Sequence, residues 1–323
     1  MKTLRKIIFR FLILPVIAFL VLVIAAAALL YFQQERVVKL AVGELNKRLP
    51  GELVIGGSNI SIFQNFPYVS IALKNVRFYA AKQPGSSQSL FEAEKIYAGF
   101  SLPDILKQHY RVKVISLKNG HLSLVEGADG RLNIVEAARM NTDTATGASD
   151  SSAALNLALK KIVLRNLDIS FLDKASGQQL ACHIDKIQSA FRDDSLHIYS
   201  SLQGNLMADL TRPGDTTLFR RKHLSADIRL SYQKATQLLK LQTGKLKLED
   251  ASFDISGTVD LLHGNTVDLR FSGDKPDFHQ LFSFAPESLA KELKHFRYDG
   301  ILDFSGTMKG KWQGDKLPRI ELS

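Results

Sequence analysis

The sequence predicts a mainly β protein in which an N-terminal membrane helix leads into a long antiparallel sheet. Residues 11–32 form an uncharged and mostly apolar run, whereas most of the remaining chain of 323 residues alternates apolar and polar side chains. Alternation with a period of two is typical of strands that have one buried face and one wet face. Turn-forming residues separate these segments at the short intervals that are typical of antiparallel meanders.

The apolar run 11–32 is long enough to cross a bilayer. A helix rises about 1.5 Å per residue, so 22 residues cover a hydrocarbon core of about 30 Å. Lys2, Arg5, Lys6 and Arg10 precede the run. The positive-inside rule therefore predicts a single-pass membrane protein with a cytoplasmic N-terminus and the bulk of the chain on the other side of the membrane. A cleaved signal peptide is the alternative, but the run is about twice as long as the usual apolar core of such a peptide.

Four regions follow from changes in composition. Residues 1–32 are the cytoplasmic tip and anchor, and 33–141 are an N-terminal block that begins with an amphipathic helix ending at Pro50-Gly51. Residues 142–153 contain almost nothing apolar beyond alanine, which predicts a solvated linker. The block 154–323 is nearly all strand, apart from a Leu- and Phe-rich helix expected at 278–296. A strand that starts in the last residues predicts that the natural chain continues past Ser323 or ends on an unpaired edge.

A sheet with one apolar face must cover that face with helices, with a second sheet or by closing on itself. The few helices in the pattern leave three solutions open, which are a sandwich, a barrel and a curled sheet whose apolar face is a groove. A large uncovered apolar surface marks a binding site or an aggregation hazard. A groove is therefore reasonable if an acyl chain occupies it. Within each segment the candidate groove residues lie two positions apart and so share a face: Val69, Ile71, Leu73, Ile169, Phe171, Ile228, Leu230, Phe253, Ile255, Leu269 and Phe271.

The order of several short motifs resembles the N-terminal region of the AsmA family, which are envelope proteins of bacteria with two membranes. The motifs are Phe66-Pro67 before an alternating strand, a helix start at 101–106, a strand ending at 117–120, and the stretch 129–133 with Asp129, Gly130 and Asn133. The second block is similar to the repeating unit of that family, in which strands ending in Ser-Gly-Thr frame a short helix.

The resemblance implies an elongated, twisted β-groove with a chorein-like N-terminal end, as in bridge-like lipid transfer proteins. It also implies an inner-membrane anchor, phospholipid acyl chains as the ligand and a role in outer-membrane biogenesis. An assembly factor that binds outer-membrane or periplasmic proteins through sheet edges is the alternative function.

Features that would indicate an enzyme are weak. The eight histidines are spread singly and show no metal-ligand spacing, Asp193-Asp194 suits a turn, and Cys182 lies in an apolar stretch. We therefore expect no catalytic residues, no cofactor and no metal. The net charge is +10, and the exported part keeps 38 basic against 32 acidic residues, which suits solubility or attraction to anionic headgroups. No run of basic residues with interleaved aromatics indicates nucleic acid.

Overall fold

The computed structural model is mainly β. It describes residues 14–82, 89–107, 109–137, 156–211, 219–249, 251–262, 266–273, 305–311 and 318–322. The first elements are α2 (Leu14–Arg48), β1 (Glu52–Ser61), β2 (Val69–Tyr79), β3 (Phe91–Phe100), α3 (Leu102–Leu106), β4 (Arg111–Glu126) and α4 (Asn133–Ala137). The following strands are β5 (Asn156–Asp173), β6 (Gln179–Asp193), β7 (His197–Thr211), β8 (Phe219–Gln233), β9 (Leu238–Leu248), β10 (Ala251–Asp260), β11 (Thr266–Gly273), β12 (Ser305–Lys311) and β13 (Arg319–Leu322).

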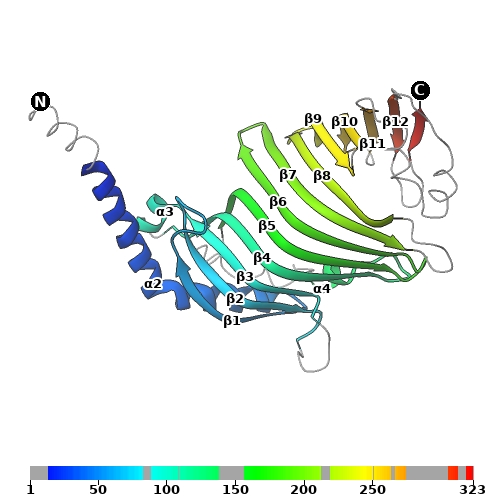
Figure 1. Ribbon diagram of the computed structural model, residues 1–323. Coiled ribbons are helices and arrows are strands. Elements are labelled where there is room, and N and C mark those ends of the chain that lie inside the picture. The colour runs from blue at the N-terminus through cyan, green and yellow to red at the C-terminus, as the bar shows by residue number, and fades with distance from the viewer. Residues whose placement is uncertain are drawn as a thin grey trace, which may run out of the picture. The chain divides into compact units, whose positions relative to one another are not determined.

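The thirteen strands of the described residues form one sheet in which each strand lies next to its neighbours in the sequence (Figure 1). The pairs β1–β2 and β2–β3 and all neighbouring pairs from β5 to β13 are antiparallel. Strands β1 and β13 stand at the two ends of this order, so the sheet is not closed. The prediction of a mainly β fold with few helices is confirmed.

Spatial contacts divide the chain into two compact units. The N-terminal unit consists of Met1–Gly120 and Ile134–Leu159, and the C-terminal unit consists of His121–Asn133 and Lys160–Ser323. The division falls within strands β4 and β5, whereas the sequence places the boundary in the linker 142–153. That linker and the expected helix 278–296 lie outside the described residues.

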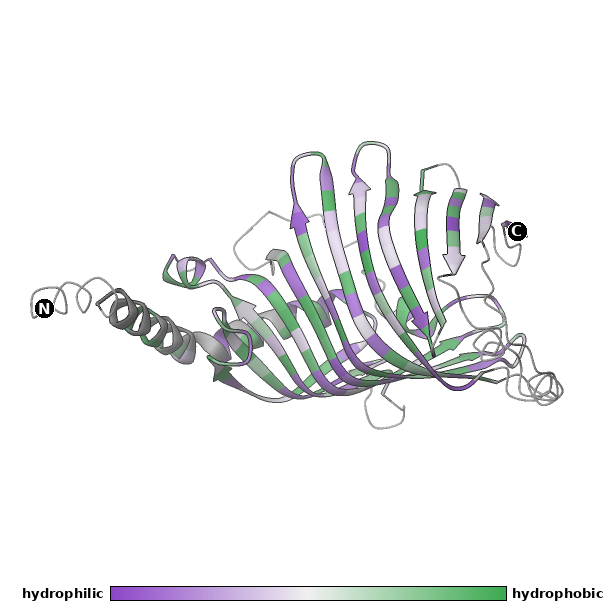
Figure 2. Cartoon of the chain, turned by 45° about the horizontal axis from the view of Figure 1, so that its top comes forward, coloured by the Kyte–Doolittle hydropathy of each residue, from purple (hydrophilic) through white to green (hydrophobic). Residues whose placement is uncertain are grey.

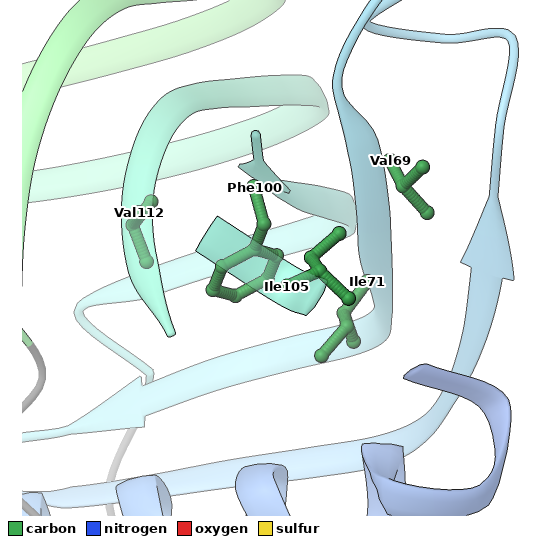
Figure 3. Packing of buried hydrophobic residues seen from close by; sticks show 5 residues of the cluster. All are labelled: Val69, Ile71, Phe100, Ile105 and Val112. Carbon is green, nitrogen blue, oxygen red and sulfur yellow. The ribbon is translucent and has the colours of Figure 1, made fainter. Parts of the chain in front are cut away.

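In the N-terminal unit, helices cover the apolar face of the sheet. Val69, Ile71 and Phe100 from the strands pack with Ile105 of α3 and Val112 of β4, and Figure 3 shows these five residues. Val38 of α2 packs against this cluster. A second cluster at the other end of the face joins residues of α2, β2 and α4 with the segment before β3: Leu45, Leu49, Phe78, Leu90 and Ala137.

Helix α2 contains the predicted amphipathic segment. It ends at Arg48, just before Pro50-Gly51, and its last two turns supply apolar side chains that cover the sheet. The predicted membrane segment 11–32 begins outside the described residues, and α2 is helical from Leu14 onward. Among the residues described by the structure, no helix has the length and apolar character needed to cross a membrane.

Short helices and turns form where the sequence provides their local signals. Ser101 is the N-cap of α3, and its hydroxyl accepts a hydrogen bond from the backbone N–H of Asp104 at 3.4 Å. Pro103 occupies the first turn, where its missing N–H costs nothing. Gly130 has a φ of 74° in the turn predicted at Asp129-Gly130, and its N–H donates to the carbonyl of Gly127 at 2.9 Å. These two predictions are confirmed.

Several strands differ from their predicted extent. The separate strands expected at 157–159 and 167–171 are parts of one strand, β5. Strand β6 is absent from the prediction because its middle carries Asp185 and Lys186, which interrupt the alternation. Leu196, expected to start a strand, lies exposed in the turn before β7.

Bulges keep the apolar residues on one face where the alternation changes phase. In β9, Leu239 and Leu241 stand at odd-numbered positions, whereas Leu246 and Leu248 stand at even-numbered positions. The register slips by one residue between Leu241 and Gly244 of β9. Leu241 therefore pairs with Gly257 and Gly244 pairs with Ile255, and both pairs lie on the same face of the sheet. In β5, Asn166 takes a φ of 52° at the corresponding change between Leu164 and Leu167. Asparagine tolerates this left-handed conformation better than most residues, and a bulge of one residue restores the phase.

Candidate functional site

The C-terminal unit carries an apolar face that extends over strands β5 to β13. Because the registers are antiparallel and in phase, residues that share a face line up in rows across the strands. One row is Ser189, Leu202, Ile228, Gly244, Ile255, Phe271, Gly306 and Leu322. The next rows on the same face are Ile187, Gly204, Ala226, Leu246, Phe253 and Gly273, and Phe191, Ser200, Leu230, Leu241, Gly257, Leu269, Met308 and Ile320. We call these three rows the apolar face.

The rows between them carry polar and charged side chains. One such row is Gln188, Gln203, Asp227, Lys245, Asp254 and Ser272. On this second face, Lys309 Nζ lies 4.0 Å from a carboxylate oxygen of Asp268, and Gln203 donates to Asp227 at 3.1 Å. Figure 2 shows the resulting alternation of hydrophobic and hydrophilic residues along the strands. The C-terminal unit therefore has one wet face and one apolar face.

A hollow of about 420 Å³ lies on the apolar face. Nearly all of its walls are aliphatic or aromatic, and its floor spans β6 to β11. The residues that line it are Ile187, Leu202, Gly204, Leu206, Leu224, Ser225, Ala226, Leu246, Lys247, Leu248, Phe253, Ile255 and Phe271. Ligand pockets in proteins are typically about 300–1,000 Å³ and mostly apolar. The hollow can hold an apolar ligand but offers few groups that could hold a polar one.

A second hollow of about 590 Å³ lies across β9 to β13 and has a more polar lining. Lys245, Asp254 and Arg270 contribute charged side chains to it. Ile255 and Phe271 contribute to the lining of both hollows, but Lys245, Asp254 and Ser272 belong to the polar row, so the second hollow lies on the wet face. Ile255 and Phe271 are also direct partners in the β10–β11 register.

Glycines stand at several positions of the apolar face where a larger residue would collide. A Cβ atom on Gly204 would lie 2.6 Å from Cγ1 of Ile187, and one on Gly306 would lie 2.4 Å from the ring of Phe271. Glycines and bulges allow a sheet to bend. At these two positions the glycine lets a neighbouring side chain lie flat over the backbone and form the surface of the face.

All eight groove residues predicted in the C-terminal unit lie in register on one face: Ile169, Phe171, Ile228, Leu230, Phe253, Ile255, Leu269 and Phe271. Three of them, Phe253, Ile255 and Phe271, line the 420 Å³ hollow. The remaining five lie beside it on the same face.

The three candidates in the N-terminal unit have a different environment. Val69 and Ile71 are 1% and 2% exposed in the cluster that α2 and α3 cover, and Leu73 packs against it. The structure corrects the expectation that these residues line an open groove, because the two helices fill the space that a ligand would need.

The sequence prediction missed most of the wall of the hollow. Ile187, Leu202, Leu206 and Leu224 belong to β6, β7 and β8, where polar residues and bulges hide the alternation. The apolar residues at even positions of β7 and β8 are the signal that could have found the last three.

The motif residues serve local structure in the N-terminal half of the chain. The peptide bond between Phe66 and Pro67 is cis. The Asn133 side chain accepts a hydrogen bond from the N–H of Val125 at 3.0 Å and donates to the carbonyl of Ser123 at 3.1 Å. Arg131 N–H donates to the Asp129 carboxylate at 3.2 Å. Asn133 therefore joins the turn after β4 to the strand itself.

Titratable groups lie apart from the 420 Å³ hollow, with Lys247 as the exception. Asp194 accepts hydrogen bonds from the backbone N–H groups of His197 and Leu196, which hold the pKa of its carboxyl below the ordinary value. This confirms the turn predicted at Asp193-Asp194. Burial raises the pKa of the Cys182 thiol, and the charge of Asp168 adds to this effect. The described residues contain no group of three or more side chains placed to hold a metal ion.

No family model matches this chain, and no curated protein matches it.

Proposed function

We propose that this protein is a membrane-anchored, periplasmic lipid-handling protein of the AsmA type. In this proposal the apolar face holds phospholipid acyl chains during their movement between the two membranes and so supports outer-membrane biogenesis. The order of the sequence motifs and the apolar run 11–32 support the family and the anchor. The chain acts as a binding protein and needs no catalytic residue.

The observation that carries the proposal is the apolar face of the C-terminal unit with its hollow of about 420 Å³. A surface of aligned Leu, Ile and Phe side chains gains free energy when an acyl chain covers it, at about 0.8 kcal/mol for each buried CH₂ group. The rows contain few hydrogen-bonding side chains, so binding depends on chain length more than on the identity of a headgroup. A ligand of this kind can also move along the rows without breaking hydrogen bonds.

Charge placed on the apolar face provides the test. Ile255→Glu puts a carboxylate in the wall of the hollow, and Leu269→Glu puts one in the next row of the same face. Ser256→Glu is the matched control, because Ser256 lies between these rows on the wet face, opposite Arg270. Thermal unfolding and mass spectrometry of co-purified lipid are measured on the full chain in each case.

We expect Ile255→Glu and Leu269→Glu to fold and to lose most of the bound lipid, while Ser256→Glu keeps it. On a face open to solvent the carboxylate reaches water, whereas in a closed core an unpaired charge costs several kcal/mol. Undiminished lipid loading in the folded variants would contradict the lipid function. Unfolding of both variants, with a stable control, would show that the face is a protein core and would equally contradict it.

The anchor is tested separately with a reporter that is active only in the periplasm, fused after Ser323. The positive-inside rule predicts activity of this fusion. Activity from a cytoplasmic reporter at the same position would contradict the proposed topology.

A further inference from the structure

Two connections of the N-terminal unit lie at the same end of its sheet. The first is the β1–β2 connection, residues 62–68, and the second is α3, which follows β3. They are neighbours because Val69, the first residue of β2, pairs with Phe100, the last residue of β3. We call residues 62–68 and 101–107 together the α3 end of the unit; Figure 1 shows α3 beside α2 at this end.

The α3 end exposes large apolar side chains. Phe63 is 87% exposed, Phe66 is 61% exposed and Leu106 is 45% exposed. The segment 62–68 contains no charged residue. Single exposed apolar residues are normal on soluble proteins, but three large ones at one end of a unit mark a surface that meets an apolar partner.

Helix α2 points its apolar half away from the sheet at this same end. Val38 packs against the cluster that contains Ile105 of α3, while Leu45 packs at the opposite end of the sheet. Asn46 lies near the start of β1 and fixes the direction of the helix relative to the strands. The residues before Val38 therefore extend past the α3 end.

The helical rise places the α3 end close to the proposed membrane surface. Val38 lies six positions after Phe32, the last residue of the apolar run, which is about 9 Å along the helix. The polar layer of each leaflet is about 5–7 Å thick. Tyr31 and Phe32 are exposed and contact each other edge to face with their ring centroids 5.8 Å apart. Aromatic side chains of this kind suit the membrane–water interface.

The charges at the α3 end favour anionic headgroups. The one carboxylate of α3, Asp104, is paired with Arg111 and Lys113, each at 3.5 Å. Lys107 is exposed at the end of α3, and Arg36 and Lys39 are exposed on α2. The basic residues here are thus Arg36, Lys39, Lys107, Arg111 and Lys113, against Glu35 and Asp104. Each basic residue near an anionic surface contributes about 1 kcal/mol to attraction.

We propose that the α3 end inserts Phe63, Phe66 and Leu106 into the interfacial layer of the bilayer that holds α2. The partner is the lipid surface itself, and the contact fixes the N-terminal unit against the membrane. This inference rests on the anchor of the proposed function, and it is independent of whether the apolar face carries lipid.

Depth-dependent fluorescence quenching tests the contact in the full chain, reconstituted in nanodiscs of phosphatidylethanolamine and phosphatidylglycerol with brominated acyl chains. The single tryptophan of the chain is first removed as Trp312→Phe. Phe63→Trp then reports on the α3 end. Val135→Trp is the matched control, because Val135 is 59% exposed on α4, whose Ala137 packs in the cluster at the opposite end of the unit. Val21→Trp, within α2, reports on insertion of the anchor.

We expect brominated lipid to quench the tryptophan fluorescence of Val21→Trp strongly. It should quench Phe63→Trp by at least about half as much and shift the emission of this variant to the blue, as an interfacial position requires. The fluorescence of Val135→Trp should stay unchanged. Quenching of Val21→Trp with Phe63→Trp no different from Val135→Trp would overturn the contact and leave the anchor intact. Absence of quenching at Val21→Trp would overturn the anchor and the contact together. Lipid loading of the same variants is measured independently, since it depends on the other unit.

Discussion

The side-chain amide of Asn46 makes both hydrogen bonds with the backbone of Leu53. Its oxygen accepts from the Leu53 N–H at 2.7 Å, and its nitrogen donates to the Leu53 carbonyl at 2.9 Å. The amide thus replaces a neighbouring strand at the start of the edge strand β1. This contact joins the last turn of α2 to the sheet and sets the angle at which the helix leaves the unit.

We predict that Asn46→Ala lowers the free energy of unfolding of the full chain by about 1–3 kcal/mol, because two partly buried backbone groups lose their partner. Urea unfolding in a mild detergent measures the change. Asn59→Ala is the control, since the Asn59 amide is exposed and makes one long contact of 3.4 Å with a neighbouring carbonyl. Equal stability of the two variants would show that the amide does not hold the helix to the sheet.

The packing of Ile105 in the core below α2 and α3 predicts that a cavity at this position lowers the free energy of unfolding strongly. Ile105 is 1% exposed between Phe100 and Val112. Ile105→Ala should lower the free energy of unfolding by about 2–4 kcal/mol, as expected for removing a buried aliphatic side chain. Leu106→Ala removes a similar side chain from the exposed neighbouring position and should change the free energy of unfolding by less than about 0.5 kcal/mol. Equal losses in the two variants would contradict the packing of Ile105.

Asp104 makes the stability of the N-terminal unit depend on pH. Burial opposes its ionisation, but the hydrogen bond with Ser101 and the charges of Lys113 and Arg111 outweigh this effect and hold its pKa below the ordinary value. A lowered pKa in the folded state means that the carboxylate stabilises the fold above the unfolded pKa of about 3.9, and that this contribution falls as the pH drops toward the folded pKa.

Asp104→Asn should therefore lower the unfolding free energy by about 1–3 kcal/mol at about pH 7, and the gap to the unsubstituted chain should narrow below about pH 4. Unfolding curves at about pH 7, 5 and 3 measure this gap across that window. A gap of equal size at all three values would show that the charge of Asp104 does not contribute.

Gly257 occupies a backbone conformation that a side chain does not permit. Its φ is 137°, and a Cβ atom would lie 2.1 Å from the carbonyl oxygen of Asp268 on the paired strand. We predict that Gly257→Ala destabilises the C-terminal unit by more than the roughly 1 kcal/mol typical of single substitutions. Gly57→Ala is the matched control, because a Cβ there has nothing within 4 Å. Thermal unfolding followed by circular dichroism compares the two variants, and a similar small shift for both would contradict the assigned backbone geometry.

The local signals in the sequence correctly predicted the end of α2 before Pro50-Gly51, the capped start of α3 at Ser101 and the turn at Asp129-Gly130. Each of these depends on the conformational preference of one or two residues, which acts over a few positions of chain. The shared face of pairs such as Phe253 and Ile255 was also predictable, because the strand period places residues two apart on the same side.

The mainly β class, the alternation within most strands, and the helix and turn boundaries named above can be predicted from the sequence, because they follow from local preferences and periods. Which apolar residues are covered depends on long-range packing. Ile71 and Ile255 have the same local pattern, yet helices bury the first, while the second lines a hollow. The register that joins β6, β7, β8 and β9 into the apolar face also depends on tertiary structure, because bulges at Asp185 in β6 and Gln242 in β9 change the phase of the pattern and only pairing with the neighbouring strand restores it.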